Sequence, residues 1–405
     1  MTSLIIIAVC TLLLLGYLFD LTASRSRIPA VILMLLLGWL ARQLTAAFDV
    51  ALPDLSPILP LFGTIGLILI VLEASLELEI NRSKVGLIRN SLIAATIPLL
   101  VLAGGLALVF QSAGAGSLRE GLMNAIPFCV ISSAIAIPSV RHLAAADREF
   151  VVYESSLSDI IGVLVFDFVV LNELIDGQTF LTAGLQIGAI AVVSFLATAG
   201  LSLLLHRIEH HIKFVPIILL VILIYAVSKV FHLPALVFIL LFGLFLGNLD
   251  ELKGFRLIER LRPDELDREA RKLKDLTGEA AFLLRALFFL LFGYLIETAE
   301  LLNTATLAWS AGIVAGIVVL RATQLRLLRI PLRPHLFLAP RGLITILLFL
   351  SIEPAHGLPF VNKSLVMQVI VLTGLLMMVG LGTTAANRPG AGLAGPAAEG
   401  AASPP

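Results

Sequence analysis

Long apolar runs, separated by short charged segments, extend along nearly the whole chain to about residue 384. An α-helix needs roughly 20 mainly apolar residues to cross a bilayer, and shorter or interrupted helices are tolerated. The pattern therefore predicts thirteen membrane-spanning helices, at residues 3–19, 28–41, 57–76, 86–110, 121–140, 151–172, 180–205, 214–230, 234–248, 279–298, 304–322, 335–352 and 364–384.

The composition agrees with this pattern. With 59% hydrophobic and 14% charged residues, the chain is more apolar and less charged than a soluble domain. It is therefore predicted to be an all-α polytopic membrane protein. The net charge of zero argues against a nucleic-acid partner. Cys10 and Cys129 both fall inside apolar runs, which favours neither a disulfide framework nor a metal site, and no cofactor is expected.

The basic residues are distributed unevenly between the loops. Loops after odd-numbered spans carry 21 lysines and arginines, against four after even-numbered spans. Because basic residues collect in cytoplasmic loops, this asymmetry predicts an external N-terminus and a cytoplasmic C-terminus in a plasma-membrane protein. Residues 386–405 are rich in Gly, Ala and Pro and are expected to form a disordered cytoplasmic tail.

The two halves of the pattern resemble each other. The runs at 28–41 and 234–248 each have a Pro-Ala pair at their start. Each also carries a glycine nine residues after the proline, Gly38 in the first run and Gly243 in the second. These runs lie seven spans apart, and an odd offset turns the second copy upside down relative to the first. An inverted-topology repeat of this kind is typical of secondary transporters.

Helix breakers occur at corresponding positions of the two halves. The span at 121–140 has prolines on both sides of Ser132 and Ser133, and seven spans later the span at 335–352 contains Pro-Arg-Gly around Arg341. Proline removes a backbone donor and interrupts a helix, which frees carbonyl groups and helix ends to hold an ion. The sequence therefore predicts two crossed discontinuous helices.

The span at 151–172 carries three carboxylates, Glu154, Asp159 and Asp167. At 1.5 Å per residue, Asp159 lies roughly 12 Å from the cytoplasmic end, near the midplane, whereas Glu154 is about one turn in. Hydrocarbon is a costly environment for a carboxylate, so Asp159 is predicted to be functional and Asp167 to be a funnel or packing acid. Ser155 and its neighbour Ser156 lie one turn from Asp159 and can add oxygen ligands.

Two further arginines, not counted with the loops, remain inside the predicted spans. Arg341 lies at a depth similar to that of Glu154, so an ion pair between them is predicted, and Asp159 then stays free to titrate. Burial favours the protonated form of a carboxyl, and a hard monovalent cation competes for the same oxygens. One such carboxylate is the minimal arrangement for exchanging a cation for a proton. Arg285 is expected to pair or to extend toward the cytoplasmic end, and a role in the ion path stays open.

Two other transport functions share part of this pattern. A sodium-coupled solute symporter of similar crossed-helix fold and a cation channel are the alternatives; a symporter needs more polar side chains at the crossing, and a channel needs no alternating-access repeat. The sequence has no nucleotide-binding glycine loop, no His-Glu-x-x-His and no Ser-His-Asp order, so enzyme activity is not expected. Residues 206–213, with three histidines, are interpreted as a solvated loop, and 249–278 as an interfacial helix or linker.

Three motifs resemble those of a known family. The sequence "ESSLSD", from Glu154 to Asp159, resembles the Glu-Ser-x-x-Asn-Asp signature of the monovalent cation/proton antiporters of the sodium/proton exchanger type. "APRGLITILLFLSI" is similar to their late Arg-Gly helix, and "ISSAIAIPSV" occupies the place of their Thr-Asp-Pro or Ser-Ser-Thr-Ala crossing helix. The resemblance covers most of the chain, in the same order.

The resemblance implies a homodimer whose membrane unit spans residues 1–385. Scaffold helices lie at 3–76 and 214–298, a mobile core at 86–172 and 304–384, and a linker helix at 180–205. It also implies roles for the site residues. Asp159 binds the ion and exchanges the proton, and Glu154 and Arg341 form a supporting ion pair. Serine oxygens lie near the ion, namely those of Ser132, Ser133, Ser155 and Ser158.

Two positions depart from the family pattern. Ser158 stands where the electroneutral branch has Asn and the electrogenic branch often has a second Asp. The missing Asp favours one-for-one exchange of a monovalent cation, Na⁺ before K⁺ or Li⁺. Ala134 stands where the Thr-Asp-Pro motif has its Asp, which leaves the branch of the family open.

Overall fold

The computed structural model describes residues 2–26, 28–48, 54–78, 80, 82–140, 143–172, 214–230, 235–248 and 263–386, with a few isolated positions between 184 and 200. The regular elements in these residues are all helical. They are α1 (Thr2–Ser26), α2 (Ala30–Ala47), α3 (Ile58–Glu77), α4 (Val85–Ser112), α5 (Leu118–Ala125), α6 (Ser133–Ser139), α7 (Ala145–Leu171), α9 (Phe214–Val230), α10 (Ala235–Gly247), α12 (Pro263–Tyr294), α13 (Thr298–Leu301), α14 (Thr304–Leu327), α15 (Leu332–His335), α16 (Leu343–Leu350) and α17 (Lys363–Ala386), with short 3-10 turns between some of them.

The predicted membrane fold is confirmed. Within the described ranges, seven helices are long and apolar enough to cross a bilayer, and three shorter apolar helices accompany them. The helix α7 is not among the seven, and it is the helix that carries the three carboxylates. The count of thirteen spans is not confirmed, because the predicted span at 180–205 lies almost wholly outside the described residues. The predicted tail lies outside them too, except for Ala386, which ends α17.

Two predicted boundaries need correction. The helix α12 begins at Pro263 and has 32 residues, so at 1.5 Å per residue it is about 48 Å long and exceeds a hydrocarbon core of about 30 Å. The described part of the segment at 249–278 is therefore a continuation of a spanning helix. The helix α14 continues to Leu327, past the expected end at residue 322, so Arg321 is not a residue of the following loop, with which the charge count grouped it, but lies well inside a helix and is buried.

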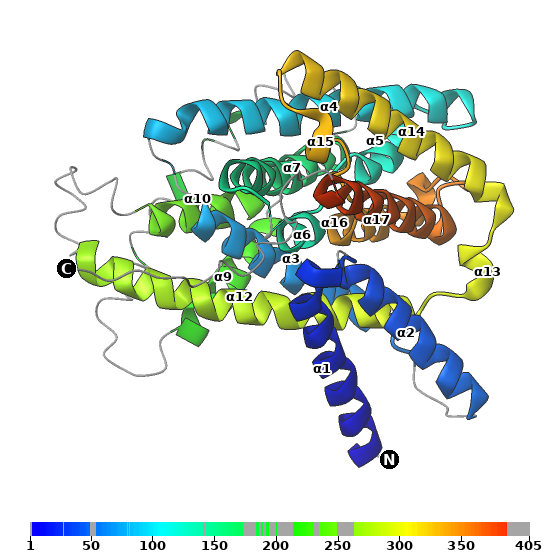
Figure 1. Ribbon diagram of the computed structural model, residues 1–405, viewed down its shortest axis with the longest axis horizontal. Coiled ribbons are helices and arrows are strands. Elements are labelled where there is room, and N and C mark those ends of the chain that lie inside the picture. The colour runs from blue at the N-terminus through cyan, green and yellow to red at the C-terminus, as the bar shows by residue number, and fades with distance from the viewer. Residues whose placement is uncertain are drawn as a thin grey trace, which may run out of the picture.

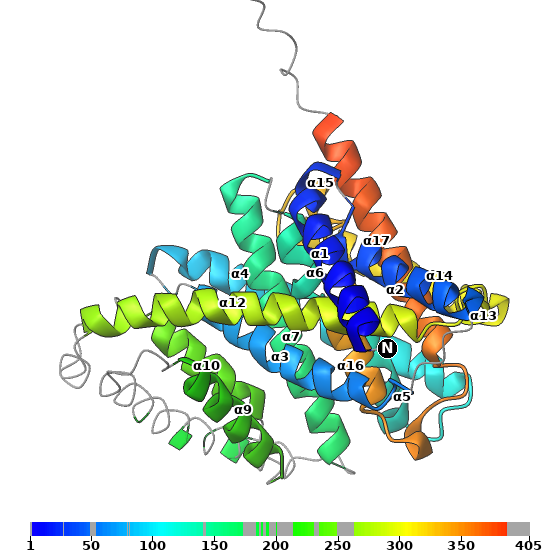
Figure 2. The ribbon, with the colours of Figure 1, turned by 90° about the horizontal axis from the view of Figure 1, so that it is seen from below.

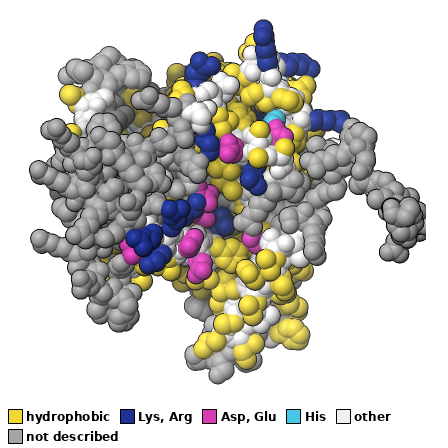
Figure 3. All heavy atoms as spheres, turned by 60° about the vertical axis from the view of Figure 1, so that its left-hand side comes forward, with side chains coloured by type: hydrophobic (Ala, Val, Ile, Leu, Met, Phe, Trp, Pro, Cys, Tyr) yellow, Lys and Arg dark blue, Asp and Glu magenta, His cyan; other side chains and the backbone are white. Residues whose placement is uncertain are grey.

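The helices form one layered bundle. Figure 1 draws α4 and α12 at opposite sides of the bundle, and Figure 2 shows α12 crossing most of the molecule. The helices α2, α3 and α10 form one packed group around α12, whereas α4 packs on α5 and α7, and α14 packs on α17. On the side drawn in Figure 3, basic and acidic side chains gather in small groups, and much of the remaining described surface is hydrophobic.

The packing reproduces the internal repeat. A side chain at Gly38 of α2 would overlap the carbonyl oxygen of Leu290 in α12, and one at Gly243 of α10 would overlap the side chain of Ser75 in α3. Corresponding glycines thus permit corresponding close approaches. The helix α2, the second predicted span, approaches α12, the tenth, and α10, the ninth, approaches α3, the third. This exchange of partners is what an inverted repeat requires.

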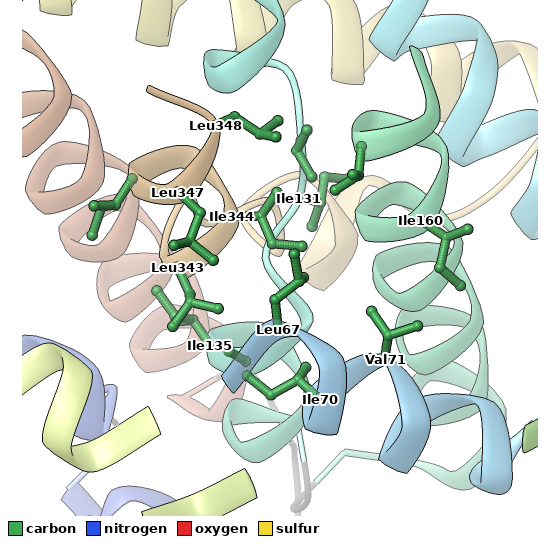
Figure 4. Close-up of a cluster of buried hydrophobic side chains, with 14 of the residues drawn as sticks. Leu67, Ile70, Val71, Ile131, Ile135, Ile160, Leu343, Ile344, Leu347 and Leu348 are labelled. Atoms are coloured by element: carbon green, nitrogen blue, oxygen red, sulfur yellow. The ribbon is translucent and has the colours of Figure 1, made fainter. Parts of the chain in front are cut away.

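An apolar contact joins α3 to the interrupted helices (Figure 4). Three residues of α3, Leu67, Ile70 and Val71, face side chains from α6, α7 and α16, namely Ile135, Ile160, Leu343, Ile344 and Leu347. Each of these eight side chains is at most 7% exposed. Apolar contacts are not directional, so the two sides can shift relative to each other here without breaking hydrogen bonds.

Candidate ion-binding site

Two interrupted helices cross next to α7, as the paired breakers predict. The first interruption follows the 3-10 turn Ile126–Phe128, and the chain is irregular until α6 begins at Ser133. The second lies between α15 and α16. The backbone N–H of Ser132 donates to the carbonyl oxygen of Pro340 at 2.9 Å, which joins the two irregular segments directly. The prediction of two crossed discontinuous helices is therefore confirmed.

Asp159 faces this crossing from the middle of α7. Its side chain is 3% exposed. The backbone N–H of Ser133 donates to Asp159 Oδ2 at 3.1 Å, and the Ser133 hydroxyl donates to the same oxygen. These donors come from the start of α6, where helical N–H groups lack partners within their own helix. The other oxygen, Oδ1, has no hydrogen-bond partner in the described part of the chain.

Two hydroxyls near Asp159 also lack partners. Ser132 Oγ and Ser156 Oγ are buried and bond to no described residue. Ser132 directly precedes Ser133, and Ser156 lies three residues before Asp159, on the same face of α7. A carboxylate and hydroxyl oxygens are the ligand type that hard cations prefer. The site thus offers several uncommitted oxygens close to the crossing.

The other predicted serines have different partners. Ser155 Oγ donates to the carbonyl of Val151 in its own helix at 2.7 Å. Ser158 Oγ accepts the backbone N–H of Ile131 at 2.9 Å and so fixes the first irregular segment against α7. Of the predicted serines, Ser133 contacts Asp159 directly. Cation binding by Ser132, Ser133, Ser155 and Ser158 stays a prediction.

The predicted ion pair between Glu154 and Arg341 is wrong, because Glu154 pairs with Arg321 instead. Arg321 Nη1 and Nη2 donate to the two Glu154 oxygens, each at 2.9 Å, and the side chains are 4% and 1% exposed. Arg321 also donates to two carbonyls of the second irregular region, those of His335 at 2.6 Å and Leu338 at 3.2 Å. The continuation of α14 to Leu327 brings Arg321 to the depth of Glu154.

Arg341 connects the two interrupted helices. Its Nε donates to the carbonyl of Phe128 at 2.6 Å and its Nη1 to that of Ala339 at 2.8 Å. Its backbone N–H donates to Thr373 Oγ1 of α17 at 3.1 Å. This last bond corresponds to the one between Ser133 and Asp159. In both halves, a backbone N–H close to the point where the interrupted helix starts again donates to a side-chain oxygen of the next long helix. Thr373 is thus the counterpart of Asp159 in the second half.

The remaining candidates lie away from the crossing. Asp167 is half-buried on α7, and Lys229 of α9 acts on it electrostatically. Its role as a funnel or packing acid stays a prediction. Arg285 is half-buried on α12 and forms no ion pair with any residue that the structure describes. The segment at 206–213 lies outside the described residues.

Arg321 and Thr373 were missed by reasoning from the sequence. A signal for Arg321 was present, because Ile313, Ile317, Arg321 and Gln324 are buried and follow each other at spacings of three or four. Such spacing is one face of a helix, and it continues past residue 322, where the span was expected to end. Nothing in the sequence distinguishes Thr373 from any other threonine in an apolar helix.

Comparisons with known proteins agree with this geometry. The family model described as sodium/hydrogen exchanger, transmembrane, matches residues 9–386. A structure of the sodium proton antiporter MjNhaP1 from Methanocaldococcus jannaschii at pH 8 is similar with a TM-score of 0.69 and 18% identity, covering 93% of this chain and 99% of that one. An electron-microscopy structure of the same antiporter gives a TM-score of 0.69 and 18% identity, with coverages of 95% and 97%. These likenesses establish the fold. No curated protein is significantly similar to the chain in sequence.

Proposed function

Since the chain belongs to the sodium/hydrogen exchanger family, whose members exchange a cation for protons across a membrane, we propose that it exchanges Na⁺, or else K⁺ or Li⁺, for H⁺ at Asp159. The observation that carries the proposal is the state of this carboxylate. It is buried, no described lysine or arginine lies within ion-pair distance of it, and one of its oxygens has no partner.

Glu154 does not compete for this role. Its charge is balanced by the two-point pair with Arg321. A buried carboxylate without a cation is costly, so Asp159 stays buried at low cost when it holds either a proton or a metal cation. Binding of one excludes the other, because both neutralise the same charge. This competition is what couples the two fluxes.

The residues around the crossing favour an electroneutral exchange. Ser158 is uncharged, and Ser132, Ser133 and Ala134 place no acid at the first interruption. With one exchangeable negative charge, one monovalent cation replaces one proton, and the loaded site has the same net charge in both cases. An imposed membrane potential is therefore expected to leave the exchange rate unchanged.

We further propose that the helices divide into a mobile core and a scaffold. The core comprises α4 to α7 and α14 to α17, and the scaffold comprises α1 to α3 and α9 to α12, which also form a homodimer contact. The apolar contact between α3 and the interrupted helices (Figure 4) supports this division, because it allows sliding. The protein then lies in the plasma membrane with its N-terminus outside.

The test uses everted membrane vesicles with an imposed proton gradient. Adding Na⁺, Li⁺ or K⁺ separately is expected to dissipate the gradient for the transported ions, which also identifies the cation. Asp159→Asn is expected to abolish the response, because an amide cannot exchange a proton for a cation. The matched control is Asp54→Asn, which makes the same chemical change at an exposed carboxylate bonded to Ser56.

The control is expected to behave as the wild type. Full exchange by a correctly inserted Asp159→Asn variant would contradict the assignment of the site. A wild type that dissipates no gradient with any of the three cations would contradict the proposed function.

A further inference from the structure

His335 is a buried titratable residue that the exchange step does not use. It is the last residue of α15, the four-residue helix before the second irregular segment, and its side chain is 2% exposed. Its Nε2 lies 3.0 Å from Asp147 Oδ1 near the start of α7. Asp147 is 37% exposed, so the pair connects a buried ring to the aqueous end of the helix.

The ring is held in a position that suits its neutral form. With Nε2–H donating to Asp147, the other nitrogen, Nδ1, is bare, and it has no partner in the described part of the chain. The ring packs on Phe150 in a T-shaped arrangement, with ring centroids 5.2 Å apart. A protonated ring has a second N–H at Nδ1, for which the described residues offer no acceptor. Burying an unpaired charged donor is costly, so protonation favours a movement of the ring toward water.

That movement would act on Arg321. The backbone carbonyl of His335 accepts the hydrogen bond from Arg321 Nε, and Leu338 three residues later accepts another. A shift of the short α15 withdraws these acceptors from the guanidinium. Arg321 then loses the contacts that orient it on Glu154, one turn before Ser158 on the helix that carries Asp159.

The charges around the ring come from two neighbouring helices. Burial disfavours the protonated ring most strongly, Asp147 and Glu154 of α7 favour it, and Arg321 of α14 disfavours it. The helix α17 also packs on α15, but its sole charged residue, Lys363, lies at its first position. Removing the carboxylate of Asp147 is therefore the direct way to make the ring harder to protonate.

We propose that His335 is a positioning residue that responds to the proton concentration on the cytoplasmic side. Its neutral form keeps Arg321 oriented on Glu154, and its protonated form removes this orientation and slows exchange. This rests on the proposed exchange function. It adds a second proton effect, separate from the competition at Asp159. Competition raises the apparent KM for the cation in acid, whereas loss of the Arg321 contacts lowers Vmax.

The test is to measure KM and Vmax for cation-driven proton movement in everted vesicles while the pH of the bath on the cytoplasmic face is varied. The wild type is expected to lose at least about threefold in Vmax as the pH falls below about 6.5 toward about 5, below the ordinary range of histidine, because burial disfavours the protonated ring. In His335→Gln, which keeps an N–H donor for Asp147, Vmax is expected to stay nearly flat, while KM keeps its pH dependence. Asp147→Asn is expected to move the acid limb of Vmax to lower pH, because the ring loses a favourable negative charge.

The matched control is His356→Gln. This histidine lies in the loop after α16, at the opposite end of the bundle, with its Nδ1 3.7 Å from Glu120, and its variant is expected to keep the wild-type profile. If His335→Gln and Asp147→Asn, both correctly inserted, keep the wild-type Vmax profile, the inference is wrong even though exchange is present. Absence of any exchange in the wild type would instead contradict the proposed function.

Discussion

Replacing Arg321 is expected to destabilise the protein more than replacing any other arginine described here. In Arg321→Met, Glu154 stays buried at 1% exposure without its cation. Removing one partner of a buried ion pair costs about 3–5 kcal/mol, since the remaining charge is left unpaired. The carbonyls of His335 and Leu338 also lose their shared donor, at about 1 kcal/mol each. The single substitution is therefore expected to cost about 5 kcal/mol or more of unfolding free energy.

The second substitution identifies the partner. In Arg321→Met with Glu154→Leu, most of the loss is expected to return, because an apolar pair of similar volume replaces a buried ion pair at little net cost. The coupling energy from this double-mutant cycle is expected to be about 3 kcal/mol. The matched cycle of Arg341→Met with Glu154→Leu is expected to give less than about 1 kcal/mol, since Arg341 is bonded to backbone carbonyls instead.

The assay is unfolding of the purified protein by titration with SDS in mixed micelles, followed by far-UV circular dichroism. The three single variants, the two double variants and the wild type are compared under the same conditions. A cost below about 1 kcal/mol for Arg321→Met, far under that expected for a buried pair, would refute the reasoning. So would a stronger coupling of Glu154 to Arg341 than to Arg321.

Two further predictions concern packing and the second half of the repeat. Val in place of Gly38 or Gly243 is expected to prevent stable folding, because each glycine contacts a neighbouring helix where a Cβ would overlap. The control is Gly312→Val, since Gly312 lies in a membrane-spanning helix with open space around it. The variants are compared by heating each purified protein and measuring the fraction that stays monodisperse. Thr373→Val is expected to slow cation exchange several-fold without unfolding the protein, because the N–H of Arg341 loses its acceptor, at about 1–3 kcal/mol. Thr373→Ser keeps the hydroxyl and is expected to restore the rate in the same vesicle assay; equal rates for the two variants would argue against this role.

The fold was largely predictable from the sequence because it depends on periodic and length-dependent features. Apolar runs set the helices, prolines set the two interruptions, and paired glycines disclosed the repeat before any contact was known. The close approaches of Gly38 and Gly243 show why the last of these worked, since a helix–helix contact at backbone distance requires a glycine. The start of α12 at Pro263 was missed because its first turns are charged and do not differ from a solvated segment.

The site was predictable in part. Asp159 could be placed because depth along a helix follows from counting residues, and no ordinary explanation applies to an acid at that depth. The partner of Glu154 could not be placed in this way. Arg321 and Arg341 both lie at suitable depths, and the choice between them depends on the angle at which α14 passes α7. Similarly, the bond from the backbone N–H of Arg341 to Thr373 and the bond from Arg321 to the backbone carbonyl of His335 involve backbone atoms at the crossing, whose positions no spacing in the sequence encodes.

The central claim is that one carboxylate binds either a cation or a proton, and proton release tests it most directly. Purified protein in weakly buffered detergent solution is titrated with Na⁺, and the protons released are measured with a pH electrode, with Li⁺ and K⁺ as parallel titrations. The account predicts release of up to one proton per protomer from the wild type and none from Asp159→Asn. Undiminished release from the Asp159→Asn variant, or release of two protons per protomer from the wild type, would contradict it.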